Sequence, residues 1–515
     1  MGRGPGRIIG RLQQFEPPTA LYDLLVVGGG INGAGIARDA AGRGMSVLLC
    51  ENDDLASATS SSSSKLIHGG LRYLEQYEFR LVAEALAERE VLLSIARHLV
   101  WPARFVMPHV QELRPRWMIR TGLFLYDHLG TFAPSLGARR ASLPGSRGVR
   151  LDLPPLNSGL RSELKHGFEY SDCRVDDARL VVANAMSARA QGARVLTRTE
   201  CVSARREGGL WQVSLSNGET PTVRAIVNAA GPWVKRVLND RLAQASRDAV
   251  RLVKGSHIVL PRLYEGAHAF ILQNDDRRVV FMIPYEGRFT LVGTTEVPVE
   301  EASRPEATAQ EIEYLCRAVN RYLAKPANAR EAVWRYAGVR PLYDDGTSDP
   351  SAVTRDYTLR VDDEAGAAPV LSVFGGKITT YRRLAEHALE KLSPYFPGIK
   401  GAWTAGAPLP GSDFGDEGRE SRSTALAVRY PKIPGATMRA LFRRHGTLAA
   451  EVLGDADSAA DLGEDFGGGL TERELAYLVA REWAITAEDV LWRRTKTGLH
   501  MTESQRTRVA ARMGR

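Results

Sequence analysis

The pattern of apolar and polar positions predicts a strand–helix–strand unit near the start of the chain. Leu21–Val27 is a short apolar run, and glycines separate it from Ile31–Ala41, which has helical spacing. A second apolar run follows at Met45–Cys50. Short apolar runs bounded by turn residues are typical of buried parallel strands, which a helix must connect. A longer helix is expected at Glu78–Leu99, where Ala, Leu, Glu and Arg dominate.

Strand patterns continue through the middle of the chain and then disappear. Strands are expected at Val223–Asn228 and Val370–Phe374, and several more between residues 250 and 300. From about residue 410 onward, Ala, Leu, Arg and Glu dominate. Prolines and a glycine at residues 408–411 mark this change. We therefore expect a separate helical domain at residues 410–515.

Composition narrows the class of protein. The chain has 515 residues, which favours two or three domains. The net charge is +8, but no stretch is dominated by Lys or Arg, so no nucleic-acid partner is expected. No apolar window long enough for a transmembrane helix is present, and residues 1–20 are expected to be a flexible tail, not a secretory signal. The cysteines, which we expect to be buried thiols in a reducing compartment without a metal, are Cys50, Cys173, Cys201 and Cys316.

The glycines after the first expected strand have the spacing of a dinucleotide-binding fingerprint. Gly28, Gly30 and Gly33 form a GxGxxG motif between strand and helix. The first permits a tight turn, the second lets the backbone approach a pyrophosphate, and the third lets the helix pack on the sheet. The helix N-terminus then offers its N–H groups to phosphate. Glu51, at the end of the next strand, is in the position of an acid that binds ribose hydroxyls.

Two later strand ends favour FAD over NAD as the nucleotide. Ala230 and Gly231 follow one expected strand and can place backbone beside a bound flavin nucleotide. Gly375, Gly376 and Lys377 follow a late strand and precede a helix, near the expected position of the flavin ring. A nucleotide domain completed by such a late strand fits FAD enzymes better than NAD dehydrogenases. The serine-rich stretch 57–64 is expected to be an ordered loop, not a solvated one, that binds FAD through Thr59, Ser60 and Ser64.

Together these motifs resemble a known family. Val27–Asp39 with the following Gly42–Gly44 is similar to the first signature of the bacterial respiratory, FAD-dependent glycerol-3-phosphate dehydrogenases, and Gly375–Arg382 is similar to the second. The resemblance extends from about residue 21 to the C-terminus. Five further stretches resemble this family: Ser64–Glu75, Gly167–Cys173, Gly255–His257, Gly338–Pro341 and Thr354–Tyr357.

The resemblance implies roles for a set of polar residues. A phosphate dianion is best held by several guanidinium donors, and an imidazole suits removal of a hydroxyl proton. A cation near the flavin would stabilise the reduced ring. His257 is the expected proton acceptor, with an arginine or water as the alternative. The implied substrate-binding residues are Arg72, Tyr73, Arg340, Arg355 and Lys377, with Arg72 and Arg355 on the phosphate, and the implied catalytic residues are His257, Arg340 and Lys377.

The resemblance also implies the reaction and its partners. It implies oxidation of sn-glycerol 3-phosphate to dihydroxyacetone phosphate by hydride transfer from C2 to flavin N5, with electrons passed to ubiquinone or menaquinone. It further implies a homodimer bound peripherally to the cytoplasmic side of the inner membrane. The stretch Pro115–Asp127, apolar with interleaved arginines, suits insertion into a lipid interface. A core-packed helix is the favoured interpretation of that stretch.

The expected fold is therefore α/β (α+β overall). It comprises a discontinuous Rossmann-like FAD domain, an inserted antiparallel-sheet substrate domain of the amino-acid-oxidase kind, and a helical C-terminal cap. Within residues 21–409, the FAD domain is expected mainly at 21–100, 165–245 and 350–400, and the substrate domain mainly at 100–165 and 245–350.

Three alternative functions stay open at this point. An amine or amino-acid oxidase on the same fold needs one arginine for a carboxylate instead of a cluster for a dianion. A glycerol-3-phosphate oxidase would use oxygen and release peroxide. A nucleotide-binding module without turnover would bind nucleic acid in a salt-sensitive way.

Overall fold

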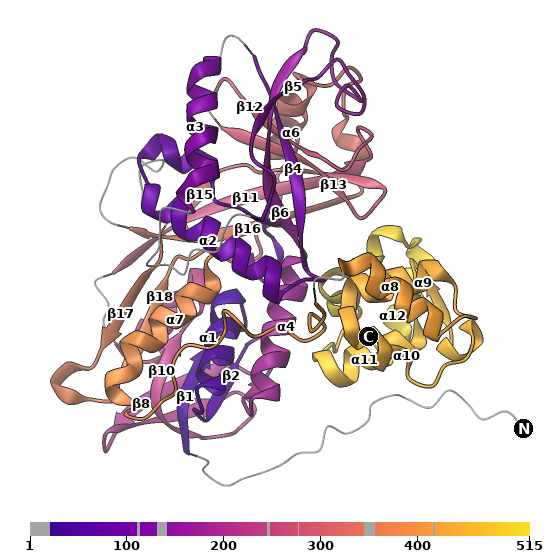
Figure 1. Cartoon of the computed structure of the whole chain (residues 1–515). Helices are drawn as coiled ribbons and strands as arrows, with labels where there is room; N and C mark the ends of the chain where they lie inside the picture. Colours follow the sequence, from indigo (N-terminus) through magenta and orange to yellow (C-terminus); the bar gives the residue numbers. More distant parts are fainter. Residues whose placement is uncertain are drawn as a thin grey trace, which may run out of the picture.

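The computed structural model describes residues 21–110, 114–130, 142–244, 248–276, 278–344, 356–415 and 418–514. The expected tail at residues 1–20 lies outside these residues. Figure 1 shows two sheet-containing bodies, one above the other, with a helical domain beside them that contains the C-terminus.

The first body is built on a mostly parallel sheet. Its central strands pair in parallel, with Val27 opposite both Cys50 and Asn228, and Asn228 opposite Ser372. The carboxyl ends of these strands therefore meet at one edge of the sheet. The strand order is β17 (Thr358–Asp362), β18 (Val370–Phe374), β10 (Thr222–Asn228), β1 (Leu21–Val27), β2 (Val47–Cys50) and β7 (Arg194–Leu196), with β9 (Leu210–Leu215) paired to β10 and β8 (Cys201–Glu207) paired to β9.

Helix α1 (Ile31–Gly42) lies between α4 (Asp177–Ala190) and α7 (Tyr381–Leu392) against this sheet. Small residues allow the close packing, because a Cβ atom at Gly35 would stand 2.7 Å from the Tyr381 ring. Ten of the twelve residues of α1 are buried, all except Asn32 and Gly42, so the helix has no solvent-facing polar side. The discontinuous nucleotide domain expected from the sequence is confirmed.

The second body is a large sheet covered on both faces. Alternate residues of one strand point to opposite faces: Ile258 and Leu260 pack with α6 (Ala309–Asn320), and Val259 packs with α2 (Phe79–Ile95) and α3 (Arg116–Leu129). All its strand pairs are antiparallel except β12–β4. The strands are β15 (Val297–Val299), β11 (Ala249–Pro261), β14 (Phe289–Gly293), β13 (Val279–Tyr285), β12 (Ala269–Gln273), β4 (Val100–Pro108), β6 (His166–Val175) and β3 (Leu66–Ile67) in order, with β16 (Trp334–Asp344) on β11 and β5 (Arg147–Arg150) on β6.

Strand β6 places the return to the first body later than the sequence suggested. We expected residues from 165 onward in the nucleotide domain, but His166–Val175 pairs with β4 in the second sheet. Its apolar character is equally compatible with either sheet. The first body resumes at α4.

The C-terminal domain is helical, as expected. Its core is formed by residues such as Leu441, Leu453 and Leu478, which are almost completely buried. It contacts the first body mainly through α4. Its elements are α8 (Gly418–Arg429), α9 (Gly435–His445), α10 (Ala449–Leu453), α11 (Glu472–Glu482), η11 (Asp489–Arg494), η12 (Thr497–His500) and α12 (Glu503–Met513), with a short hairpin of β19 (Asp465–Gly467) and β20 (Leu470–Thr471).

Helix α3 combines both interpretations of its sequence. Ile119, Leu123 and Tyr126 are buried, as in a core-packed helix. On the opposite side, Trp117 is 68% exposed and Phe124 is 59% exposed. None of the helices in the described part of the chain is long and apolar enough to cross a membrane. The four cysteine side chains are buried and not in disulfides.

Candidate functional site

The residues expected to bind FAD converge at the carboxyl edge of the parallel sheet. Gly28 follows β1, Glu51 follows β2, Ala230 follows β10 and Gly375 follows β18. The register of the strands puts these ends side by side. Ligands of doubly wound sheets bind at this edge.

The geometry of the glycine turn matches the roles assigned from spacing. Gly28 has φ +113°, and a Cβ there would stand 2.6 Å from the Ala229 carbonyl oxygen. A Cβ at Gly33 would stand 1.9 Å from the Gly28 oxygen, so only glycine lets α1 begin this close to the strand. At Gly30, the nearest atom to a Cβ would be Ser60 Oγ at 3.1 Å. Gly30 therefore lies beneath the serine-rich loop, where backbone can approach a pyrophosphate.

Glu51 is held against the same turn. Its carboxylate accepts hydrogen bonds from the N–H groups of Gly29, at 2.6 Å, and Asp53, at 2.9 Å. Desolvation raises the pKa of Glu51, and these two N–H groups oppose the rise. The carboxylate is thereby fixed beside the turn, where an acid that binds ribose would be needed.

The serine-rich loop is ordered, in agreement with the sequence interpretation. Thr59 Oγ1 donates to the Val339 oxygen at 2.6 Å, and Ser60 Oγ accepts from the Ile31 N–H at 3.0 Å. Ser64 Oγ lies 2.9 Å from His257 Nε2. The loop thus connects the start of α1 to the second sheet, and Ser64 contacts the expected base. Binding of FAD by Thr59, Ser60 and Ser64 stays a prediction.

The turn after β18 also faces α1. Gly375 and Gly376 have φ +78° and +103°, and Asn32 Nδ2 donates to the Gly375 oxygen at 3.2 Å. Asn32 Oδ1 is buried without a hydrogen-bond partner among the described residues. Such an atom can be satisfied by a hydroxyl of a bound nucleotide. This orphaned acceptor and the glycine-lined turn fit FAD. Ala230 and Gly231, with Gly231 at φ +55°, stand at the same edge.

Lys377 lies before helix α7, and a turn at residues 378–380 separates it from Tyr381, where the helix starts. Lys377 Nζ instead lies 3.8 Å from the centre of the Tyr73 ring, a cation–π contact. The structure therefore brings together two of the expected substrate-binding residues.

His257 is buried next to the serine-rich loop. Its ring stacks on Tyr336, with centroids 4.9 Å apart and an interplanar angle of 15°. Burial lowers the pKa of His257 well below 6.5, and the charges of Arg340 and Lys65 lower it further. Nδ1 has no hydrogen-bond partner among the described residues. Both effects favour the neutral imidazole, which is the form that can accept a proton.

Two of the three arginines expected to face the substrate meet, Arg72 of the expected phosphate pair and Arg340. Arg72 Nη1 lies 3.6 Å from Glu296 Oε2, and Arg340 Nη1 lies 3.5 Å from Glu296 Oε1. All three side chains are partly exposed, between 22% and 33%. The third arginine, Arg355, lies outside the described residues. A single carboxylate thus bridges two guanidinium groups from distant parts of the chain.

Sequence reasoning missed three residues of this site. Glu296 follows β14 and carries no motif spacing, so only its position between the arginines identifies it. Tyr336 lies opposite His257 in the β11–β16 register, which an alternating pattern along both strands could have suggested. His68 lies within a family-like stretch; desolvation lowers its pKa to about 4, and the charge of Lys377 contributes.

Aromatic contacts link the site to the C-terminal domain. Trp334 contacts Tyr336 with ring centroids 4.8 Å apart, and Trp492 stacks on Trp334 at 4.9 Å. His257, Tyr336 and both tryptophans therefore form a continuous series of ring contacts across two domains, stacked at both ends and tilted by 44° between Tyr336 and Trp334. The site therefore combines a buried imidazole at His257 with two arginines that meet on Glu296, and Ser64 links His257 to the loop beside the nucleotide edge.

Comparisons with known proteins identify the family to which the chain is similar. The profile of the family described as FAD dependent oxidoreductase matches residues 23–382, and that of the C-terminal domain of alpha-glycerophosphate oxidase matches residues 402–514. A glycerol-3-phosphate dehydrogenase of Pseudomonas aeruginosa is 54% identical over 97% of this chain and 97% of its own. A D-erythritol 1-phosphate dehydrogenase of Brucella abortus is 52% identical over 95% of this chain and 97% of its own. The FAD complex of glycerol-3-phosphate dehydrogenase from Bacillus halodurans has a TM-score of 0.70 at 26% identity, covering 96% of this chain and 94% of that one.

Proposed function

Because the chain belongs to the family of FAD-dependent glycerol-3-phosphate dehydrogenases, we propose that it oxidises sn-glycerol 3-phosphate to dihydroxyacetone phosphate. The observation that carries the proposal is the meeting of Arg72 and Arg340 on one carboxylate. Guanidinium groups that converge on an oxyanion are what a phosphate ester requires. An amino-acid oxidase would need only one such group for its substrate's carboxylate.

In this proposal the substrate phosphate takes the position that Glu296 now shares with the two arginines. The pairs at 3.5 and 3.6 Å are long for charge-assisted hydrogen bonds, and their side chains are partly exposed. Such pairs contribute little stability and exchange easily. Lys377, which lies on the ring of Tyr73, adds a further positive charge for the substrate.

The carbinol carbon of the substrate lies next to His257. A bound FAD would supply the two-electron acceptor for the hydride that leaves C2 of the substrate. The neutral His257 imidazole accepts the hydroxyl proton, and Ser64 holds the ring in place through Nε2. Arg340 keeps positive charge beside the developing oxyanion. Burial of His257 excludes water from the proton transfer.

Anaerobic titration of the purified yellow protein tests this proposal. We expect sn-glycerol 3-phosphate to bleach the flavin absorbance, and glycerol and glycine to leave it unchanged. D-erythritol 1-phosphate belongs in the same series, because a dehydrogenase of that compound is almost as similar to this chain (52% identical) as a glycerol-3-phosphate dehydrogenase is (54% identical). Bleaching by glycine, or none by glycerol 3-phosphate, overturns the proposal. Salt-sensitive binding of DNA without any bleaching supports the non-enzymatic alternative.

We also propose that the electrons pass to ubiquinone or menaquinone at the cytoplasmic side of the inner membrane. The resemblance to respiratory enzymes supports this acceptor over oxygen. Turnover with a water-soluble quinone under nitrogen is the expected result. Stoichiometric peroxide under air with no quinone reduction points instead to an oxidase.

The exposed side of α3 is the surface that we propose to contact lipid. Trp117 and Phe124 lie on it beside Met118 and Leu125, and Figure 1 shows the helix on the side of the molecule away from the C-terminal domain. Aromatic and basic side chains together favour an anionic bilayer interface. Replacing Trp117 and Phe124 by Ser should lower affinity for phosphatidylglycerol vesicles about tenfold, without changing turnover with a soluble acceptor. Unchanged vesicle binding contradicts this assignment.

A further inference from the structure

The loop that follows β2 is fixed between the nucleotide turn and the C-terminal domain. We name residues 51–56 the Glu51 loop. On its inner side, the Ala56 N–H donates to the Gly29 oxygen at 3.1 Å, and Leu55 Cδ2 stands 2.9 Å from where a Gly29 Cβ would be. Glu51 itself binds the Gly29 N–H. Any shift of this loop therefore moves the glycine turn and the carboxylate expected to bind ribose.

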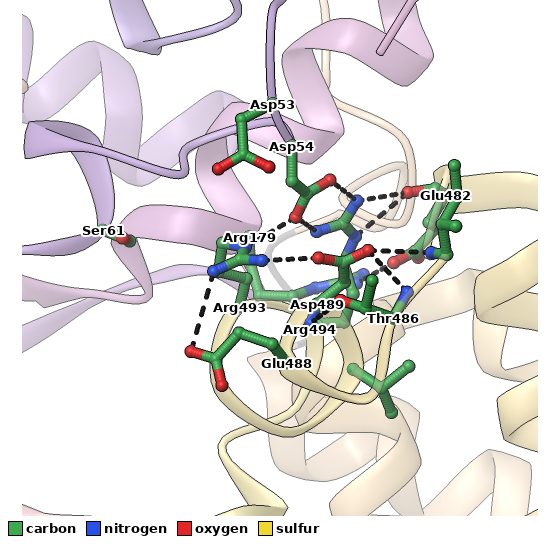
Figure 2. A network of polar contacts seen from close by, with 12 residues as sticks. Asp53, Asp54, Ser61, Arg179, Glu482, Thr486, Glu488, Asp489, Arg493 and Arg494 are labelled. Atoms are coloured by element: carbon green, nitrogen blue, oxygen red, sulfur yellow. Dashed lines mark hydrogen bonds and ion pairs between the residues drawn. The ribbon is translucent and has the colours of Figure 1, made fainter. Parts of the chain in front are cut away.

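On its outer side the loop presents a single buried carboxylate. Asp54 is completely buried, and Arg494 binds it with both terminal nitrogens, Nη1 to Oδ2 at 2.6 Å and Nη2 to Oδ1 at 2.7 Å. Arg493 Nε donates to Oδ2 at 2.6 Å. Figure 2 shows both guanidinium groups pointing from the C-terminal domain toward Asp54. A bidentate pair with a third bond is among the stronger carboxylate contacts in proteins.

The two arginines are themselves anchored within the C-terminal domain. Arg494 is completely buried and donates from Nε and Nη2 to the Glu482 carbonyl oxygen, at 3.0 and 2.6 Å. Arg493 Nη2 lies 2.5 Å from Asp489 Oδ1. Asp489 also accepts from the N–H groups of residues 485 and 486. The arginines therefore fix Asp54 relative to the C-terminal domain.

A second connection reaches the same loop from the other side. Arg198 donates its backbone N–H to the Asp53 oxygen at 2.8 Å, while its side chain binds Asp489 at 2.9 and 3.0 Å. The neighbouring Thr199 N–H donates to the Glu51 oxygen at 2.7 Å. The Glu51 loop is thus held at Glu51, Asp53 and Asp54. Two of these connections, from Asp53 through Arg198 to Asp489 and from Asp54 to Arg494, lead to the C-terminal domain.

We propose that the C-terminal domain contributes to FAD binding. Its residues Arg493 and Arg494 position the Glu51 loop for the adenosine half of the cofactor. They are positioning residues, because they act through Asp54 and do not reach the glycine turn. The proposal depends on FAD binding alone. It stands whether the substrate is glycerol 3-phosphate or another compound.

The test compares two buried arginines of the same domain. Arg494→Met removes the bond to the Glu51 loop. Arg444→Met is the matched control, because Arg444, whose side chain is 10% exposed, makes a bidentate pair with the buried Glu474, at 2.7 and 2.6 Å, entirely inside the C-terminal domain. Loss of FAD from the full-length holoenzyme is followed by flavin fluorescence on dilution, and unfolding by a thermal melt.

The expected result separates cofactor affinity from stability. Both variants should melt earlier, but only Arg494→Met should raise the Kd for FAD, by about tenfold or more, as loss of an orienting partner commonly does in ligand sites. Arg494→Lys, which keeps the charge without the fork, should fall in between. An unchanged Kd in Arg494→Met, or equal rises in both variants, overturns the proposal.

A second variant covers the case in which Arg494→Met does not accumulate in folded form. Arg493→Met removes one bond to Asp54 from a side chain that is 11% exposed, so a smaller disturbance of the core follows. Its Kd for FAD should rise above that of Arg444→Met. If it matches the wild-type value, the arginines only fasten two domains together.

Discussion

Two pairs of arginines in this protein meet carboxylates in opposite ways. Arg72 and Arg340 approach Glu296 at 3.6 and 3.5 Å and are about one-third exposed. Arg493 and Arg494 approach Asp54 at 2.6 Å and are nearly or completely buried. At Glu296, water or a ligand can replace the carboxylate as the partner of the arginines. At Asp54, the contact between the C-terminal domain and the first body, which we call the Asp54 joint, is buried and its carboxylate cannot be replaced. In this protein, the burial of an arginine and its distance to the carboxylate therefore indicate whether it binds a ligand or supports the structure.

Removing the buried carboxylate should have the largest effect. Asp54→Ala leaves two buried guanidinium groups without their partner, which typically costs about 3–5 kcal/mol of stability. Urea unfolding of the full chain measures this loss. The neighbour Asp53, whose side chain is 62% exposed, supplies the control. Asp53→Ala should change stability by less than about 0.5 kcal/mol. Similar losses in both variants would show that Asp54 is not a fixed joint.

Removing a pocket arginine should act on substrate instead of stability. Arg340→Ala should lower kcat/KM for glycerol 3-phosphate roughly 30- to 1,000-fold, because a charged hydrogen bond to the bound dianion is lost. This factor corresponds to a loss of about 2–4 kcal/mol in transition-state stabilisation. The free energy of unfolding should change by less than about 1 kcal/mol, as for other exposed ion pairs. Steady-state kinetics and urea unfolding on the same preparation give both values. A strong loss of stability with unchanged kinetics contradicts the pocket assignment.

The bridging carboxylate should oppose ligand binding weakly. Glu296→Gln keeps the shape of the side chain and removes its charge, so inorganic phosphate and glycerol 3-phosphate no longer displace an anion from the arginines. Since each exposed pair is worth at most about 1 kcal/mol, the Kd of phosphate should fall by roughly three- to fivefold. Flavin difference spectra at constant ionic strength report the binding. A weaker affinity for phosphate would mean that Glu296 orients the arginines for the ligand and does not compete with it.

The smallest effect should appear in the pH dependence of stability. Burial, followed by the charge of Arg340, depresses the pKa of His257 in the folded protein below 6.5. Below pH 6.5 the unfolded chain therefore binds a proton that the folded one excludes, and the folded state loses stability as pH falls. Arg340→Met should reduce this loss. Melting curves of both proteins at pH values on either side of 6.5 measure the difference. Parallel curves would show that the charge of Arg340 does not reach the imidazole.

The nucleotide edge was predictable because its requirements are local. Gly28 and Gly33 have to be glycine for contacts made within a few residues, so their spacing alone identifies the turn. Glu51 follows from the length of one strand–helix–strand unit. Binding of FAD by the serine-rich loop was expected from composition alone. The loop is ordered because Ser60 and Thr59 contact Ile31 and Val339, and these contacts cannot be deduced from the sequence.

The pocket and the joint were harder to predict because their partners are distant in sequence. Glu296 gains its role only when β14 and β16 bring it between Arg72 and Arg340. Asp54 pairs with residues more than four hundred positions later, in a domain whose own sequence suggested only helices. The family resemblance supplied Arg72, His257 and Arg340, but no local pattern in the sequence connects Asp54 to Arg494.

The most direct test is a crossed titration of Arg340→Ala and Arg494→Met. Each protein is titrated with FAD, and then, saturated with FAD, with glycerol 3-phosphate. We predict that Arg340→Ala raises only the Kd for glycerol 3-phosphate and that Arg494→Met raises only the Kd for FAD, each by about tenfold or more. If either variant weakens both ligands equally, the division between exchangeable pocket arginines and fixed joint arginines is wrong.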